Sequence, residues 1–177
     1  MKAIVLKEFG GIENFLVKEI PEPRVNNGQV LIRVEAIGIN PVDIKTRKGS
    51  GQAAQYKDAP EKVIGWDVAG VITRVAPDVK DFSVGDEVFG TINFPGKGGA
   101  YAEYAVAPAH QLARNPTNVS MAEAAAATLA TLPAWQALVD LAHVGKGDPV
   151  LIHGGAGGVG NYAVPIATPL GCYVMPP

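Results

Sequence analysis

A glycine-rich loop near the end of the sequence constrains the fold more than any other feature. The loop matches the pattern G-x-G-x-x-G and consists of Gly155, Ala156, Gly157, Gly158, Val159 and Gly160. The apolar run Val150–His153 before it predicts a strand, and a helix is expected over Asn161–Leu170. This order of elements opens a parallel α/β domain, in which a pyrophosphate approaches the bare glycine backbone and meets N–H groups at the helix N-terminus. The loop is therefore the predicted dinucleotide-binding site.

The segment after the loop departs from the usual form of such a site. Pro165 and Pro169 fall inside the expected helix, where a proline costs roughly 3 kcal/mol, so we expect a helix that is short or kinked after Ala163. A strand over Cys172–Met175 follows, and the sequence then ends at Pro176-Pro177. The residue that binds the ribose or a 2′-phosphate lies about 20 residues beyond such a loop. We therefore expect an incomplete cofactor domain, poorly ordered in isolation after about Gly147, which does not by itself separate NAD from NADP.

The first 108 residues follow a different pattern, in which short strands alternate with turns rich in glycine, proline and asparagine. The expected strands are Lys2–Leu6, Phe15–Ile20, Val30–Ile39, Val63–Val75, Glu87–Ile92 and Tyr101–Val106. One short helix is expected over Pro41–Arg47, with Asn40 as its N-cap and a proline at its first position. This part of the chain predicts a compact, barrel-like β unit.

The composition changes near Thr117, where alanine and leucine become frequent. Ser120 and Glu123 have the spacing of a capping box, and the helix that they open is expected to reach about Ala142 with an interruption at Pro133. The predicted class is α/β overall, with a β-rich domain over residues 1–120 and a connecting helix with an incomplete cofactor domain over 121–177.

Charge and composition exclude several classes of function. The net charge is −2, with 15 basic and 17 acidic residues interspersed, so neither nucleic acid nor an anionic membrane surface is an expected partner. No apolar run approaches the roughly 20 residues of a membrane span. The single cysteine, Cys172, excludes an intrachain disulfide and a multi-cysteine zinc cluster. A cytoplasmic protein is expected.

Five short motifs then occur in a characteristic order. They are Gly38–Asp43, Gly65–Gly70, Phe82–Val88, Ala100–Tyr104 and the glycine loop. Together they resemble the medium-chain dehydrogenase/reductase superfamily, and within it the zinc-independent quinone oxidoreductases related to ζ-crystallin. The resemblance implies a GroES-like β domain followed by a Rossmann domain, with the active site in the cleft between them. It also implies NADPH-dependent reduction of quinones or α,β-unsaturated carbonyls, with NADP(H) favoured over NAD(H), and it is compatible with a homo-oligomer.

The residues at two positions argue against a metal site. Zinc-dependent relatives place a cysteine and a histidine where Asn40 and Trp66 stand here. An indole is no zinc ligand and an amide is a poor one. We therefore expect hydride transfer without a metal, in which the protein positions the nicotinamide and stabilises the negative charge that develops on oxygen.

Three polar residues around the short helix are the candidates for catalytic roles. Asn40 is expected to contact the nicotinamide or the substrate, and the alternative is that it only caps the helix. Asp43 and Arg47 lie one turn apart, so they belong either to the site or to an ion pair that holds the helix.

Other positions depart from the family pattern. Many relatives have a tyrosine in place of Lys45, a proline in place of Thr128 and, in place of Pro133, a threonine that would face the nicotinamide. Thr128 or Thr131 are the available substitutes. The alternative to an enzyme is a catalytically inactive, truncated or crystallin-like structural or binding protein, which the early stop, the helix prolines and the displaced threonine favour.

Overall fold

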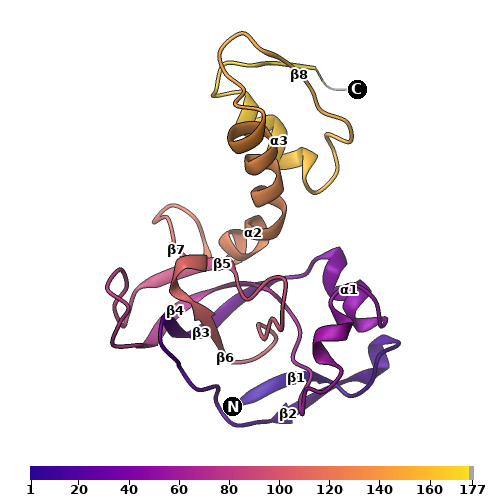
Figure 1. Ribbon diagram of the computed structural model, residues 1–177, viewed down its shortest axis with the longest axis vertical. Helices are drawn as coiled ribbons and strands as arrows, with labels where there is room; N and C mark the ends of the chain where they lie inside the picture. Colours follow the sequence, from indigo (N-terminus) through magenta and orange to yellow (C-terminus); the bar gives the residue numbers. More distant parts are fainter. Residues whose placement is uncertain (176–177) are drawn as a thin grey trace. The chain divides into compact units, whose positions relative to one another are not determined.

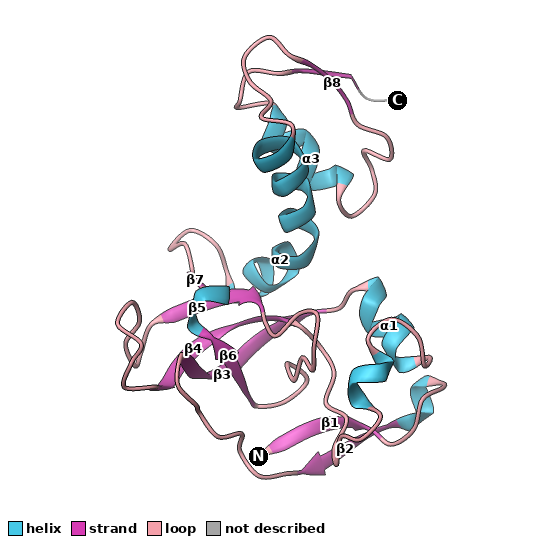
Figure 2. Ribbon diagram, in the orientation of Figure 1, coloured by secondary structure: helices cyan, strands magenta, loops and turns pink. Residues whose placement is uncertain are grey.

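The computed structural model describes residues 1–175, so the two terminal prolines lie outside the described residues. The chain divides into two compact units, Met1–Thr128 and Leu129–Pro177 (Figure 1). Strands dominate the first unit and helices the second (Figure 2). Among the described residues, no helix is both long and apolar enough to cross a bilayer.

The first unit contains a hairpin and a larger antiparallel sheet. The hairpin pairs β1 (Lys2–Leu6) with β2 (Phe15–Glu19). The sheet has the strand order β6-β3-β4-β5-β7. Its strands are β3 (Gln29–Gly38), β4 (Asp67–Val75), β5 (Glu87–Thr91), β6 (Tyr104–Pro108) and β7 (Ala113–Arg114). The helix α1 (Pro41–Arg47) follows β3 directly, as the asparagine–proline pair predicts.

The largest buried cluster of this unit comes mainly from alternate residues of the sheet, and Ile92 and Ala100 join it from the segment between β5 and β6. These fully or almost fully buried side chains are Val30, Ile32, Val68, Ile72, Val88, Ile92, Ala100, Ala105 and Ala107. The opposite face is also covered at β4, where Ala69 packs with Ala124 and Ala125 in a second buried cluster.

Two predicted strands start later than expected. The strand expected from Val63 begins only at Asp67, because Gly65 has a φ of +93° and breaks the extended backbone. The strand expected from Tyr101 begins at Tyr104, and Tyr101 instead exchanges backbone hydrogen bonds with Ile4 and Ile64. Both errors have the same cause. The segments just before β4 and β6 are connections between strands, and they are rich in apolar and aromatic residues because they are buried, which resembles the composition of a strand.

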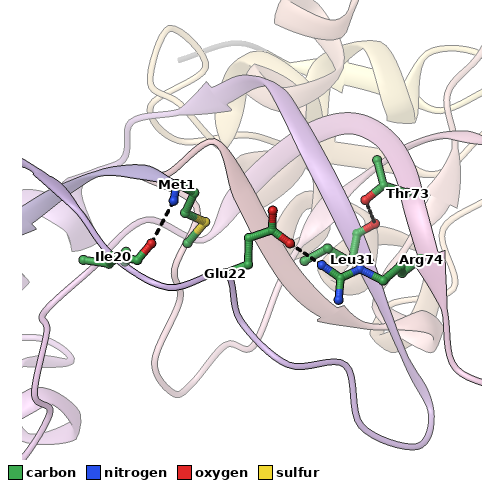
Figure 3. A network of polar contacts seen from close by, with 6 residues as sticks. All are labelled: Met1, Ile20, Glu22, Leu31, Thr73 and Arg74. Carbon is green, nitrogen blue, oxygen red and sulfur yellow. Dashed lines mark hydrogen bonds and ion pairs between the residues drawn. The ribbon is translucent and has the colours of Figure 1, made fainter.

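Polar contacts join the N-terminus to the segment after β2 and link β3 to β4 (Figure 3). The Met1 ammonium group donates to the Ile20 carbonyl at 2.8 Å, and Arg74 forms an ion pair with Glu22. Exposed contacts of this kind are worth little individually, so the apolar core carries the stability of the unit.

The helix α2 (Met121–Trp135) begins at the predicted capping box. The Ser120 backbone N–H donates to Glu123 Oε2 at 2.9 Å, and the Glu123 N–H donates to Ser120 Oγ at 3.3 Å. The predicted interruption at Pro133 is wrong, because α2 continues through it to Trp135. The backbone then widens into a π-helical segment, η4 (Gln136–Leu141), so the irregularity follows the proline instead of coinciding with it.

The second unit has the predicted order of strand, glycine loop, helix and strand. The strand β8 (Pro149–Leu151) pairs in parallel with β9 (Tyr173–Met175), and α3 (Gly160–Ala167) connects them. The helix is short, as expected, but it continues through Pro165 and ends two residues before Pro169. Its buried side chains share a small core that consists of Ala134, Leu138, Ile152, Ala163 and Ala167.

Candidate functional site

Three residues far apart in the sequence meet on one rung of the five-stranded sheet. Gly38 of β3 lies opposite Asp67 of β4, and Asp67 lies opposite Thr91 of β5. Asp67 is fully buried, and the Thr91 hydroxyl donates to Asp67 Oδ1 at 2.7 Å. The register of the two strand pairs therefore places a carboxylate and a hydroxyl together at the end of β3 from which α1 begins.

Gly38 makes room for this arrangement. A Cβ at its position would lie 2.9 Å from Asp67 Cβ and 2.7 Å from the Ala125 carbonyl oxygen of α2. Both distances are shorter than a van der Waals contact, so a side chain at residue 38 would displace the aspartate, the helix or both.

Asn40 lies two residues beyond this rung, and the structure confirms the capping role predicted for it, while contact with the nicotinamide or substrate stays a prediction. It is the extended N-cap of α1 and forms a capping box with Asp43, whose Oδ2 accepts the Asn40 backbone N–H at 2.7 Å. Its amide Nδ2 also donates to Asp67 Oδ2 at 2.7 Å. The residue is half-buried, so its side chain borders both the interior and the surface.

Asp43 is a buried carboxyl group with 3% of its surface exposed. Burial raises its pKa to about 6, the hydrogen bond from the Asn40 N–H and the proximity of the Tyr101 hydroxyl oppose this increase, and the charge of nearby Asp67 adds to it. In return, burial first and the charge of Asp43 second raise the pKa of Tyr101 above its ordinary value. Asp43 thus changes protonation closer to neutral pH than an exposed aspartate does.

Arg47 does not pair with Asp43, so the structure does not form the ion pair considered from the sequence. Its guanidinium group donates to the Gly10 carbonyl oxygen at 2.6 Å. Arg47 therefore ties α1 to the turn after β1, while Asp43 faces the interior of the unit.

Trp66 is a packing residue. It is fully buried, its indole N–H donates to the Gly96 carbonyl at 3.0 Å, and its ring meets Tyr56 and Phe94 edge-on at 6.4 and 6.0 Å. Within residues 1–175, no three histidine, cysteine, aspartate or glutamate side chains form a group that could hold a metal ion.

The glycine loop has the geometry that a pyrophosphate requires. A Cβ at Gly160 would lie 2.2 Å from the Gly154 carbonyl oxygen, so only glycine permits the helix to start this close to the loop. The loop is closed by hydrogen bonds from the Gly157 N–H to the Gly154 carbonyl at 2.7 Å and from the Asn161 N–H to the Gly157 carbonyl at 2.8 Å. Gly158 is exposed, and a Cβ there would meet no atom within 4 Å. The residues present therefore fit a dinucleotide phosphate group.

Several other residues are placed differently from the sequence interpretation. His153, the last residue of the run that predicts a strand, lies beyond the end of β8 and is exposed. The Thr128 hydroxyl bonds to the Ala125 carbonyl of its own helix at 3.2 Å, and Lys45 is exposed. Sequence reasoning did not identify Thr91 or Tyr101, since their contacts depend on strand register and on a crossing segment.

Comparisons with known proteins agree with this fold. Residues 26–117 match the family described as "Alcohol dehydrogenase GroES-like domain". The quinone oxidoreductase of Pongo abelii is 38% identical over 99% of this chain and 52% of its own length. An Arabidopsis thaliana protein named NADPH-dependent alkenal/one oxidoreductase, chloroplastic, is 37% identical over 94% of this chain and 44% of its own.

A solved structure extends the likeness to three dimensions. The quinone oxidoreductase from Coxiella burnetii superposes with a TM-score of 0.89 at 37% identity, over 99% of this chain and 56% of that one. The chain thus spans about half the length of the proteins that it matches. With more than half of its residues inside the family match and the whole fold shared, the chain belongs to the alcohol dehydrogenase GroES-like family of the medium-chain dehydrogenase/reductase superfamily.

Proposed function

We propose that the chain serves an NADPH-dependent oxidoreductase that reduces quinones or α,β-unsaturated carbonyls by hydride transfer without a metal. The observation that carries the proposal is the glycine loop, in which Gly160 packs against Gly154 while Gly158 faces open space. Relatives named quinone oxidoreductase and alkenal/one oxidoreductase support the same chemistry and do not favour the alternative of an inactive structural protein.

The cofactor side of the site would be the loop from Gly155 to Gly160 with the N-terminus of α3 behind it. When bound, NADPH supplies the hydride. Exposed backbone at Gly158 would allow its pyrophosphate to approach, and the helix N-terminus favours negative charge. The preference for NADP(H) over NAD(H) is supported by the relative named for NADPH dependence.

The substrate side of the site would lie in the β-rich domain over residues 1–120, with residues 121–177 contributing to cofactor binding. Asn40 would donate to an oxygen on which negative charge develops, which is a stabilisation suited to a site without a metal. Asp43 and Arg47 would act indirectly, since their hydrogen bonds to the Asn40 N–H and the Gly10 carbonyl hold α1 in place. The single cysteine fits a cytoplasmic, reducing location.

The proposal is tested by measuring oxidation of NADPH, and separately of NADH, in the presence of a quinone or an α,β-unsaturated ketone. The assay is run on the chain and on the chain extended by the remaining half of the Pongo abelii quinone oxidoreductase. We expect NADPH-dependent turnover that a metal chelator leaves unchanged. Turnover by the extended form alone would assign the activity to a complete two-domain protein, whereas no turnover by either form would contradict the proposal.

A further inference from the structure

Asn40 is held by hydrogen bonds from its side-chain amide and from its backbone N–H. Its Nδ2 donates to Asp67 Oδ2 at 2.7 Å, and its backbone N–H donates to Asp43 Oδ2 at 2.7 Å, which fixes the residue at the start of α1. Both oxygens of the Asp67 carboxyl group accept hydrogen bonds, one from the Thr91 hydroxyl and one from the Asn40 amide, so the nitrogen end of the amide points toward Asp67. An amide nitrogen carries two hydrogens, and one of them is donated to Asp67 in this hydrogen bond. Asn40 is half-buried and lies just beyond the end of β3, so the second hydrogen is the one that a ligand could accept.

The Asp67 carboxylate is itself fixed. Its Oδ1 accepts the Thr91 hydroxyl at 2.7 Å, its Oδ2 accepts the Asn40 amide, and the side chain is fully buried. Hydrogen bonds in such a buried place are stronger than at the surface, and a carboxylate held at both oxygens has little freedom to rotate. The order Thr91, Asp67, Asn40 is thus a rigid chain of donors and acceptors.

We propose that Asp67 and Thr91 are positioning residues that orient the Asn40 amide as a hydrogen-bond donor toward a carbonyl oxygen of the substrate or the nicotinamide. The inference rests on the proposed function for its ligand. It makes that function more specific, because the outward side of the amide matches an oxygen that gains negative charge and does not match a group that can only donate.

Turnover of closely matched variants tests the positioning role. Thr91→Val removes the hydroxyl with little change of shape, Thr91→Ser retains it, and Thr73→Val removes a β4 hydroxyl that bonds the Leu31 carbonyl, away from the rung. We expect Thr91→Val to lower kcat about tenfold, less than the roughly 100-fold loss typical of removing a direct oxyanion donor. The KM for NADPH should stay within about twofold, and Thr91→Ser should retain most of the rate. Equal losses in the two Thr91 variants would overturn the proposal.

A double variant separates an indirect role from an independent one. If Thr91 acts through Asn40, adding Thr91→Val to Asn40→Ala should cause no further loss of kcat, because the interaction is already absent. If instead the fold-loss of kcat in the double variant equals the product of the losses in the two single variants, Thr91 acts independently of Asn40, and the inference is contradicted.

A readout that needs no activity comes from NMR of the side-chain amide groups of the chain. We expect Thr91→Val to shift the Asn40 side-chain resonances while the backbone amides of α1 stay in place, and Thr73→Val to leave both unchanged. Thr91→Ala serves in the same way if the valine variant does not fold. An unchanged Asn40 resonance in a folded Thr91 variant would overturn the inference even if the chain is active. The expected shift in a chain without turnover would support the positioning and refute only the proposed reaction.

Discussion

At the scale of single residues, Asp43 is a titratable carboxyl group buried inside the β-rich unit. Burial raises its pKa from 3.8 to about 6 in the folded chain, so between these pH values the folded state binds a proton that the unfolded state does not. The free energy of unfolding should therefore fall as pH rises through this window. We predict that wild type loses up to about 3 kcal/mol relative to Asp43→Asn across it, measured by urea unfolding. Parallel pH profiles of the two proteins would contradict the buried charge.

The close packing around Gly38 leads to a second prediction at this scale. Because a methyl group at residue 38 would come within 2.9 Å of Asp67 Cβ, Gly38→Ala should destabilise the chain by about 1 to 3 kcal/mol. Gly145→Ala is the matched control, since a Cβ there meets nothing within 4 Å. Equal urea midpoints for the two variants would mean that the rung is not as tightly packed as described.

At the scale of elements, the capping box of α2 is a local feature with a measurable value. Ser120→Ala removes the acceptor for the Glu123 N–H and should cost about 1 kcal/mol. Ser83→Ala is the control, because the Ser83 contact to Asp86 uses its backbone N–H and survives the change. A loss no greater than in the control would show that the cap does not stabilise the helix.

The elements also show why some features could be predicted from the sequence and others could not. The caps at Asn40 and Ser120, and the parallel pairing around the glycine loop, follow from short-range patterns and are confirmed. The pairing of Asp67 with Thr91, which are 24 residues apart in the sequence, depends on the register of β4 and β5, which no local pattern encodes. An aspartate opening an otherwise apolar strand was the one available signal, since a buried carboxylate requires a partner.

At the scale of the whole molecule, the two units differ in how much apolar surface they bury. The first has several buried clusters, whereas the second has one small core and two strands of three residues each. Small cores and two-stranded sheets are only marginally stable, so the second unit should open at a lower free energy. We predict that native-state hydrogen exchange is faster in β8 and β9 than in β3 and β4. Equal protection would also contradict the expectation of poor order after Gly147.

The central claim is that the glycine loop binds the pyrophosphate of NADPH, and a fluorescence titration with NADPH tests it most directly. Gly158→Ala adds a methyl group at an open position of the loop without a clash, and Gly145→Ala adds one at an equally open position outside it. We expect wild type and Gly145→Ala to bind alike and Gly158→Ala to bind at least about tenfold more weakly, a difference of about 1.4 kcal/mol. Equal affinity in all three proteins, or no binding by wild type, would contradict the claim.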